Sequence, residues 1–152
     1  MEKENWLLEE TLLHEKYQIK KVKWISPGGT TGQESIYNGL NAMRDQISDE
    51  SIVLVHDGVR PLIDEELISD NIEMVKKKGT AVTVVPAIET IMLVDENNQI
   101  VQNVDRQRCR VVRAPQSFRY QDILEAHDKA RKAGINNIVD SATMMAAEGY
   151  TL

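Results

Sequence analysis

Helical periodicity of apolar residues, or a pair of helix start and stop signals, marks five segments of the chain. These segments are residues 4–18, 31–47, 64–79, 121–133 and 140–148. In the second segment, Thr31 and Glu34 fit a capping box, and the apolar residues that follow recur every three or four positions. In the third segment, acidic residues open the helix and three lysines close it before Gly79, which suits the helix dipole and a left-handed cap. The pattern therefore predicts five helices.

Short apolar runs between these segments predict strands. The runs lie at residues 20–25, 51–56, 81–85, 90–94, 99–103 and 110–114. Residues 52–55 are continuously apolar, as expected for a strand buried on both faces of a parallel sheet. Residues 90–94 and 99–103 flank the polar residues 95–98, so this pair predicts a hairpin.

Helices and strands thus alternate along the chain, with one hairpin inserted late. Such alternation favours an α/β fold, in which an open, mostly parallel sheet with right-handed crossovers carries helices on both faces. In sheets of this kind, ligands bind beyond the carboxyl ends of the strands. The rule selects residues 27–35 and 56–61 as candidate ligand-binding loops.

Composition narrows the class of protein without changing this picture. The length suits one domain, expected to span residues 1–152, and a hydrophobic content of 41% is ordinary for a globular chain. The net charge of -6 excludes a basic protein that binds nucleic acid or anionic lipid through general electrostatics. Cys109 is the only cysteine, so neither an intramolecular disulfide nor a cysteine-rich metal site is expected. No signal peptide or membrane-spanning run stands out, which predicts a cytoplasmic protein without membrane or nucleic-acid partners.

Two residues of the second candidate loop carry chemistry. Asp57 follows an apolar strand, where its carboxylate could bind Mg²⁺ together with phosphate oxygens or accept a hydrogen bond from a ribose hydroxyl. The alternative is a turn-forming aspartate that bonds its own backbone beside Gly58. Arg60 could likewise fork onto a phosphate or form a structural pair with Asp57. Position alone leaves these alternatives open.

A glycine-rich turn and an arginine cluster offer further candidate sites. Gly28 and Gly29, followed by two threonines, could hold an anion or a base through backbone N–H groups, although neither a Walker A sequence nor a G-x-G-x-x-G fingerprint occurs. The cluster places a cation at every second or third residue of an otherwise acidic chain: Arg106, Arg108, Arg110 and Arg113. It could line a site for an anionic substrate or supply solvated charges to an edge strand.

Several motifs resemble one family in their order and spacing. They are Gly28-Gly29, Ser35-Ile36, Gly39-Leu40, V-H-D-G-V-R-P at 55–61, Val104-Asp105-Arg106 and A-P-Q-S-F at 114–118. Together they resemble the polyol-phosphate cytidylyltransferases, which couple CTP to methylerythritol 4-phosphate or ribitol 5-phosphate and release pyrophosphate. The resemblance covers almost the whole chain. It implies a Rossmann-like sheet with a projecting β-arm, about residues 88–113 here, that exchanges with a partner subunit.

The resemblance also implies roles for individual residues. Those expected to bind the nucleotide are Gly28, Gly29, Thr30, Ser35, Asp57 and Gly58. Those expected to bind the polyol phosphate are Arg60, Thr90 and Arg106, the last two reaching across from the partner's arm. Asp57 and Arg106 are thereby expected to be catalytic, with Asp57 binding Mg²⁺ or another divalent cation. CTP, a polyol phosphate and a second copy of the chain are the implied partners.

The chain also departs from the family's pattern. The family's first strand, its Gly-rich G-x-G-x-R-M loop with the lysine after it, and its Asn-Ile-Lys segment are absent from this sequence. Gly32 stands where relatives usually carry Arg, and Ala114 where many carry Thr. The chain is therefore expected to be a central piece of a cytidylyltransferase, weakly active or inactive alone. The alternative is a non-catalytic module that dimerises or binds a polyol phosphate.

Overall fold

A computed structural model describes residues 16–152 of the chain. Its elements in chain order are α2 (Gly32–Ala42), β1 (Ile52–Val55), α3 (Glu65–Lys78), β2 (Thr80–Pro86), β3 (Ile91–Val94), β4 (Ile100–Val104), the 3-10 helix η1 (Arg106–Arg108), β5 (Arg110–Arg119), α4 (Tyr120–Lys132) and α5 (Ser141–Ala147). The helix predicted over residues 4–18 lies outside the described residues, except for its last positions, of which Lys16 and Tyr17 are helical.

The central sheet has three strands in the order β1-β5-β2. Both outer strands run antiparallel to β5, with Ile52 opposite Arg119 and Thr80 opposite Phe118. The prediction of mostly parallel strands is therefore wrong for the described residues: β1 and β2 share one direction, but β5 lies between them. The physical reason is the hairpin excursion after β2, which returns the chain alongside β2 in the opposite direction.

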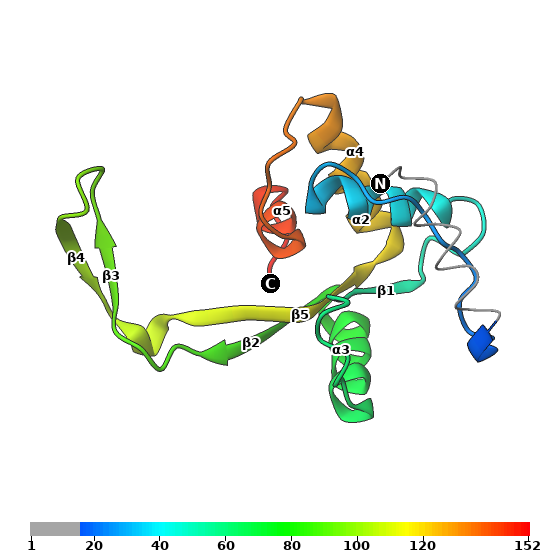
Figure 1. The fold of residues 1–152 in the computed structure, drawn as a ribbon, viewed down its shortest axis with the longest axis horizontal. Coiled ribbons are helices and arrows are strands. Elements are labelled where there is room, and N and C mark those ends of the chain that lie inside the picture. Colours follow the sequence, from blue (N-terminus) through cyan, green and yellow to red (C-terminus); the bar gives the residue numbers. More distant parts are fainter. Residues whose placement is uncertain (1–15) are drawn as a thin grey trace.

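Helices cover both faces of this sheet, as predicted for an α/β fold (Figure 1). α3 lies on one face, and α2, α4 and α5 lie together on the other. The helix start signals were read correctly: Thr31, Asp64 and Asp140 are N-caps whose side chains accept the backbone N–H three residues on. Gly79 takes the left-handed conformation at the end of α3, with φ +88°.

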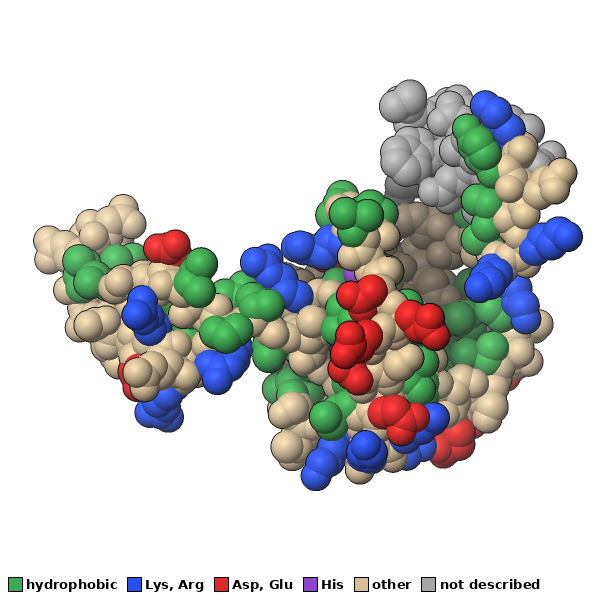
Figure 2. Space-filling model, turned by 90° about the horizontal axis from the view of Figure 1, so that it is seen from below, with side chains coloured by type: hydrophobic (Ala, Val, Ile, Leu, Met, Phe, Trp, Pro, Cys, Tyr) green, Lys and Arg blue, Asp and Glu red, His purple; other side chains and the backbone are tan. Residues whose placement is uncertain are grey.

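A hairpin arm projects from the body of the molecule, as predicted (Figure 1). β2 and β5 run outward as a paired stem, and β3 and β4 form a separate two-stranded sheet at its end. Asp95 holds the tip, since its Oδ1 accepts the N–H of Asn97 at 2.8 Å and that of Gln99 at 2.9 Å. Figure 2 shows the arm as a lobe of its own with hydrophobic side chains on its surface.

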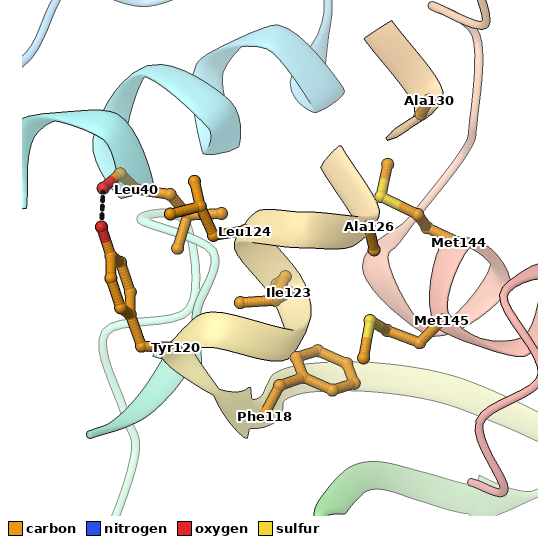
Figure 3. Packing of buried hydrophobic residues seen from close by; sticks show 9 residues of the cluster. All are labelled: Leu40, Phe118, Tyr120, Ile123, Leu124, Ala126, Ala130, Met144 and Met145. Carbon is orange, nitrogen blue, oxygen red and sulfur yellow. Dashed lines mark hydrogen bonds between the residues drawn. The ribbon is translucent and has the colours of Figure 1, made fainter. Parts of the chain in front are cut away.

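The main hydrophobic core lies between the sheet and the three helices of one face (Figure 3). α4 supplies its centre through Ile123 and Leu124, and α5 closes it with Met144 and Met145. The Tyr120 hydroxyl donates to the Leu40 carbonyl at 3.0 Å, which ties α4 to α2. Burial raises the pKa of this tyrosine, so it stays neutral and keeps its proton for that bond.

A polar network attaches α3 to the opposite face of the sheet. The Asn71 amide donates to the Thr83 hydroxyl of β2 at 3.2 Å, and its carbonyl accepts the Ser117 hydroxyl of β5 at 2.8 Å. Ser117 is fully buried and Asn71 is 5% exposed. Both partners are satisfied, as buried polar groups require.

Two local predictions were wrong. Residues 20–25 form no strand and pair with neither sheet of the described chain, so no ladder supports the extended conformation there. The helix predicted to continue to Ile47 ends at Ala42, and Asp45 lies in the left-handed region with φ 61°. Ile47 nevertheless packs against the core, which explains why its spacing looked helical.

Candidate functional site

The glycine-rich turn lies directly before α2 and is fixed by side chains from the first turn of that helix. Gly29 donates its N–H to the Ser35 Oγ at 2.8 Å. A Cβ at Gly29 would lie 2.4 Å from the Glu34 Cβ, so no other residue fits there without displacing the helix turn. Position 29 thus requires glycine because the backbone there approaches α2 closely. The prediction that its N–H holds an anion or a base stays untested, and in this structure that N–H is bonded to Ser35.

Glu34 accepts two hydrogen bonds from Thr30, the next residue of the turn. Its Oε2 accepts the Thr30 N–H at 2.5 Å and the Thr30 hydroxyl at 2.7 Å. In return, the Glu34 N–H donates to the Thr31 Oγ1 at 3.1 Å. The predicted capping box therefore forms, but the carboxylate reaches back one residue further than the usual pattern, to Thr30 instead of Thr31.

The second candidate loop follows β1 and is closed by its own side chains. The Arg60 Nε donates to the Asp57 Oδ2 at 2.9 Å, with both side chains about half exposed. The Arg60 carbonyl also lies 2.7 Å from His56 Nε2. The structure thus shows the Arg60 pair with Asp57, and no hydrogen bond within residues 16–152 ends on Asp57 Oδ1. Gly58 lies in the open, with nothing near its position for a Cβ.

The predicted residues of the arm lie at the elbow between the stem and the hairpin. The Arg106 Nη1 donates to the Ile88 carbonyl at 2.9 Å, two residues before Thr90. Figure 1 places this elbow at the far end of the β2–β5 stem from α2 and β1. Within one chain, the structure therefore does not bring Thr90 and Arg106 together with Asp57 or with the glycine-rich turn.

The arginine cluster keeps its charges free of ion pairs with the described part of the chain. Arg106 and Arg110 donate hydrogen bonds to backbone carbonyl oxygens. None of the four arginines forms an ion pair with a carboxylate in residues 16–152. No three His, Cys, Asp or Glu side chains among these residues are grouped to hold a metal ion. A cation at Asp57 would need ligands from a substrate or from water.

A pocket of about 380 Å³ next to the turn was not predicted from the sequence. Thr30 and Glu34 form one side of it, and His127 and Arg131 of α4 form the other. The Arg131 guanidinium stacks 4.4 Å from the ring centre of Tyr37. His127 is 1% exposed, and burial lowers its pKa to about 4, so the imidazole is neutral at physiological pH. Helical periodicity carries no signal for such a pocket, because its walls come from separate elements.

These features define an α/β protein with candidate ligand loops at a helix start and beyond a strand. The sequence profile of the 2-C-methyl-D-erythritol 4-phosphate cytidylyltransferase family matches residues 2–152, and the chain belongs to this family. It is 48% identical over 136 residues to a ribitol-5-phosphate cytidylyltransferase of Vibrio parahaemolyticus, a match that covers 89% of this chain and 57% of that protein. It is 36% identical to a 2-C-methyl-D-erythritol 4-phosphate cytidylyltransferase of Alkaliphilus oremlandii, with coverages of 91% and 57%.

Solved structures of the family share the fold. The crystal structure of the Thermus thermophilus 2-C-methyl-D-erythritol 4-phosphate cytidylyltransferase matches with a TM-score of 0.69 and 33% identity, over 83% of this chain and 59% of that one. The Francisella tularensis enzyme of the same name gives 0.73 and 27%, with coverages of 82% and 58%. The chain thus spans somewhat under three fifths of the length of these relatives. Among residues 16–152, no helix is long and apolar enough to cross a membrane.

Proposed function

We propose that this chain supplies the central part of a cytidylyltransferase that transfers CMP from CTP to a sugar-alcohol phosphate. A phosphate oxygen of the polyol phosphate attacks the α-phosphorus of CTP, a new O–P bond forms, and the bond to the β-phosphate breaks to release pyrophosphate. The observation that carries the proposal is the preformed turn Gly28–Thr30, held open by Glu34 and Ser35 beside the family's sequence match.

The charged residues would act on the phosphates. Phosphoryl and nucleotidyl transfer depend on positioning and on stabilising an anionic transition state. Arg60 donates its Nε–H to Asp57, so its other guanidinium N–H groups could donate to a phosphate. Arg106 of a partner's arm would balance charge on the polyol phosphate, with Thr90 beside it.

Asp57 would hold the divalent cation, expected to be Mg²⁺. Mg²⁺ is commonly bound by one or two protein carboxylates together with substrate phosphates and water, so a single exposed carboxylate fits it. The Arg60 pair leaves Asp57 Oδ1 for this purpose. When bound, the cation would neutralise phosphate charge. A cytoplasmic location belongs to the same proposal.

The favoured polyol phosphate is ribitol 5-phosphate. Relatives named for that substrate in Vibrio parahaemolyticus and Streptococcus agalactiae share 48% and 46% identity with this chain, against 36% for the Alkaliphilus protein named for the methylerythritol substrate. Within a family, the higher identity favours the shared substrate.

A homodimer formed through the arm completes the proposal. An isolated two-stranded hairpin is marginal in water. Apolar residues on both strands of this hairpin are about half exposed or more: Leu93, Val94, Ile100 and Val101. The same arm of a second copy around a two-fold axis would cover them, and would carry Arg106 to the partner's loops.

A chimaera tests the proposal, with this chain replacing the matching 136-residue segment of the Vibrio relative. We expect it to release pyrophosphate from CTP with ribitol 5-phosphate, more slowly with methylerythritol 4-phosphate, and not without Mg²⁺. Calorimetry of the chain itself with each polyol phosphate accompanies the assay. Binding without turnover in the chimaera would favour the non-catalytic module, and the absence of both would contradict the proposal.

A further inference from the structure

The pocket between α2 and α4 is lined by a buried polar side chain that has no partner in the described chain. His127 is 1% exposed, and neither of its ring nitrogens has a hydrogen-bond partner among residues 16–152. Buried polar groups are hydrogen-bonded as a rule, because an unmade bond costs the full desolvation of the group. His127 lines the pocket of about 380 Å³, so a ligand there can supply a partner.

A single water molecule does not account for both nitrogens. A second cavity of about 10 Å³ also adjoins His127, and the buried Ser141 hydroxyl beside it has no partner in residues 16–152 either. This cavity has room for about one water, which could bridge Ser141 and one ring nitrogen. The two nitrogens of an imidazole point in different directions, so the other nitrogen is left for the larger pocket.

Arg131 brings a positive charge to the same pocket. It lies four residues after His127 on α4, which places both side chains on one face of the helix. The Tyr37 ring of α2 contacts both, with its centre 4.4 Å from the Arg131 guanidinium carbon and 6.1 Å from the centre of the imidazole. No carboxylate of residues 16–152 forms an ion pair with Arg131. Its stacked, planar guanidinium is therefore placed to bind an anion.

The other walls limit the charge that the pocket can accept. Gln33 uses its amide within the chain, since Nε2 donates to the Ile135 carbonyl at 2.8 Å and Oε1 accepts the Ile138 N–H at 3.0 Å. Among the described residues that line the pocket, Glu34 is the one carboxylate. A ligand with one negative charge can pair with Arg131, whereas a second charge would be repelled by Glu34. The volume suits a small organic molecule better than a single ion.

We propose that this pocket binds a small hydroxy acid, whose carboxylate pairs with Arg131 and whose hydroxyl groups hydrogen-bond to His127. An arginine fork matches a carboxylate with two parallel N–H donors. A neutral imidazole has one donor and one acceptor nitrogen, and a hydroxyl group can serve either. His127 and Arg131 lie on α4, outside both candidate loops and the arm, so the inference does not depend on the proposed function.

The test titrates the chain, labelled with ¹⁵N in its histidines, with glycerate, glycerol 3-phosphate and glycerol at millimolar concentration. The three probes share a hydroxylated carbon skeleton and differ in charge. Glycerate should shift the imidazole signal of His127, which is the signal lost in His127→Leu, and leave that of His56 unchanged. Glycerol lacks the charge for Arg131 and should bind about tenfold more weakly or worse. Glycerol 3-phosphate should also bind more weakly than glycerate, because its second charge is repelled by Glu34.

Two variants separate the pocket from the general charge of α4. Arg131→Gln should weaken glycerate binding by about tenfold or more. Lys132→Gln is the matched control, because it removes the same charge from the neighbouring exposed residue, which does not line the pocket, and it should leave the affinity unchanged. Thermal unfolding checks that both variants are folded.

The outcomes that would overturn the inference are distinct. They are a His127 signal that glycerate does not shift, an equal loss of affinity in Arg131→Gln and Lys132→Gln, and tighter binding of glycerol 3-phosphate than of glycerate. A titration with CMP then separates the pocket from the glycine-rich turn. CMP should leave His127 at its glycerate-bound position. Displacement of glycerate by CMP would mean that both ligands share one site, and would also overturn the inference.

Discussion

Gly29 is the single residue on which the candidate nucleotide turn depends most. Replacing it with alanine puts a Cβ 2.4 Å from the Glu34 Cβ, so the turn must shift and the Glu34–Thr30 bonds must lengthen. We expect Gly29→Ala to lower the free energy of unfolding by about 1–3 kcal/mol and to abolish CMP binding. Gly32→Ala is the control, since nothing lies within 4 Å of its Cβ position; it should be neutral or slightly stabilising. Thermal unfolding and the CMP titration distinguish the two.

His127 makes stability depend on pH. Burial lowers its pKa in the folded chain to about 4, whereas the unfolded chain has the ordinary value of 6.5. Between these values the unfolded state binds a proton that the folded state does not, so stability falls as pH drops from 6.5 to 4. The loss should approach about 2–3 kcal/mol. Urea unfolding at several pH values checks this, and His127→Gln should flatten the dependence over that range; an equally steep fall in the variant would assign it to other groups.

The sequence predicts the structural role of some single residues and not of others. Thr31 was predicted as a cap because a cap is a local signal, and its side chain accepts the expected N–H of Glu34. Asp64 and Asp140 open the helices predicted over residues 64–79 and 140–148, and the structure shows both as caps. His127 and Arg131 gave no signal of a shared pocket, because their neighbours come from α2, more than eighty residues away. The Asp57–Arg60 pair was one of two open alternatives; the geometry shows the pair, and phosphate binding by Arg60 stays a prediction.

At the scale of elements, α3 is held to the sheet by Asn71 as much as by apolar contact. Asn71→Ala would leave the Ser117 hydroxyl, which is fully buried, without its acceptor, and Thr83 without its donor. The expected cost is about 1–3 kcal/mol, measured by urea unfolding. Asp70→Ala, at the exposed neighbouring position, should change stability by less than about 0.5 kcal/mol. Equal effects of the two substitutions would contradict this account of α3.

Helices were predicted more accurately than strands, for a physical reason. Helix ends depend on residues a few positions apart, so α3 was placed within one residue. Strand direction and length depend on the partner strand. β5 was expected to end at Ala114 but continues to Arg119, because β1 and β2 pair with its polar second half as well. The antiparallel order could not be read from the apolar run at residues 52–55, which looks the same in either direction.

At the scale of the whole molecule, the exposed hairpin predicts self-association. Ile100 is 66% exposed on β4, so Ile100→Glu should weaken the proposed dimer by placing a charge in the interface. Met74→Glu, at an exposed apolar position of α3 away from the arm, is the control and should leave association unchanged. Sedimentation equilibrium at micromolar concentration measures both. A folded wild-type monomer of 17.2 kDa at that concentration would contradict the dimer.

The central claim is that the loops of one chain and the arm of another form one cytidylyl-transfer site. Subunit mixing of the Vibrio chimaera tests it most directly, with Asp57→Ala in one preparation and Arg106→Ala in the other. Each variant alone should release little pyrophosphate from CTP and ribitol 5-phosphate. After unfolding and refolding together, half the dimers are mixed and each carries one intact site, so activity should return to about a quarter of the unmutated chimaera. Mixtures no more active than the separate variants, from a chimaera that is itself active, would contradict a site shared between two chains.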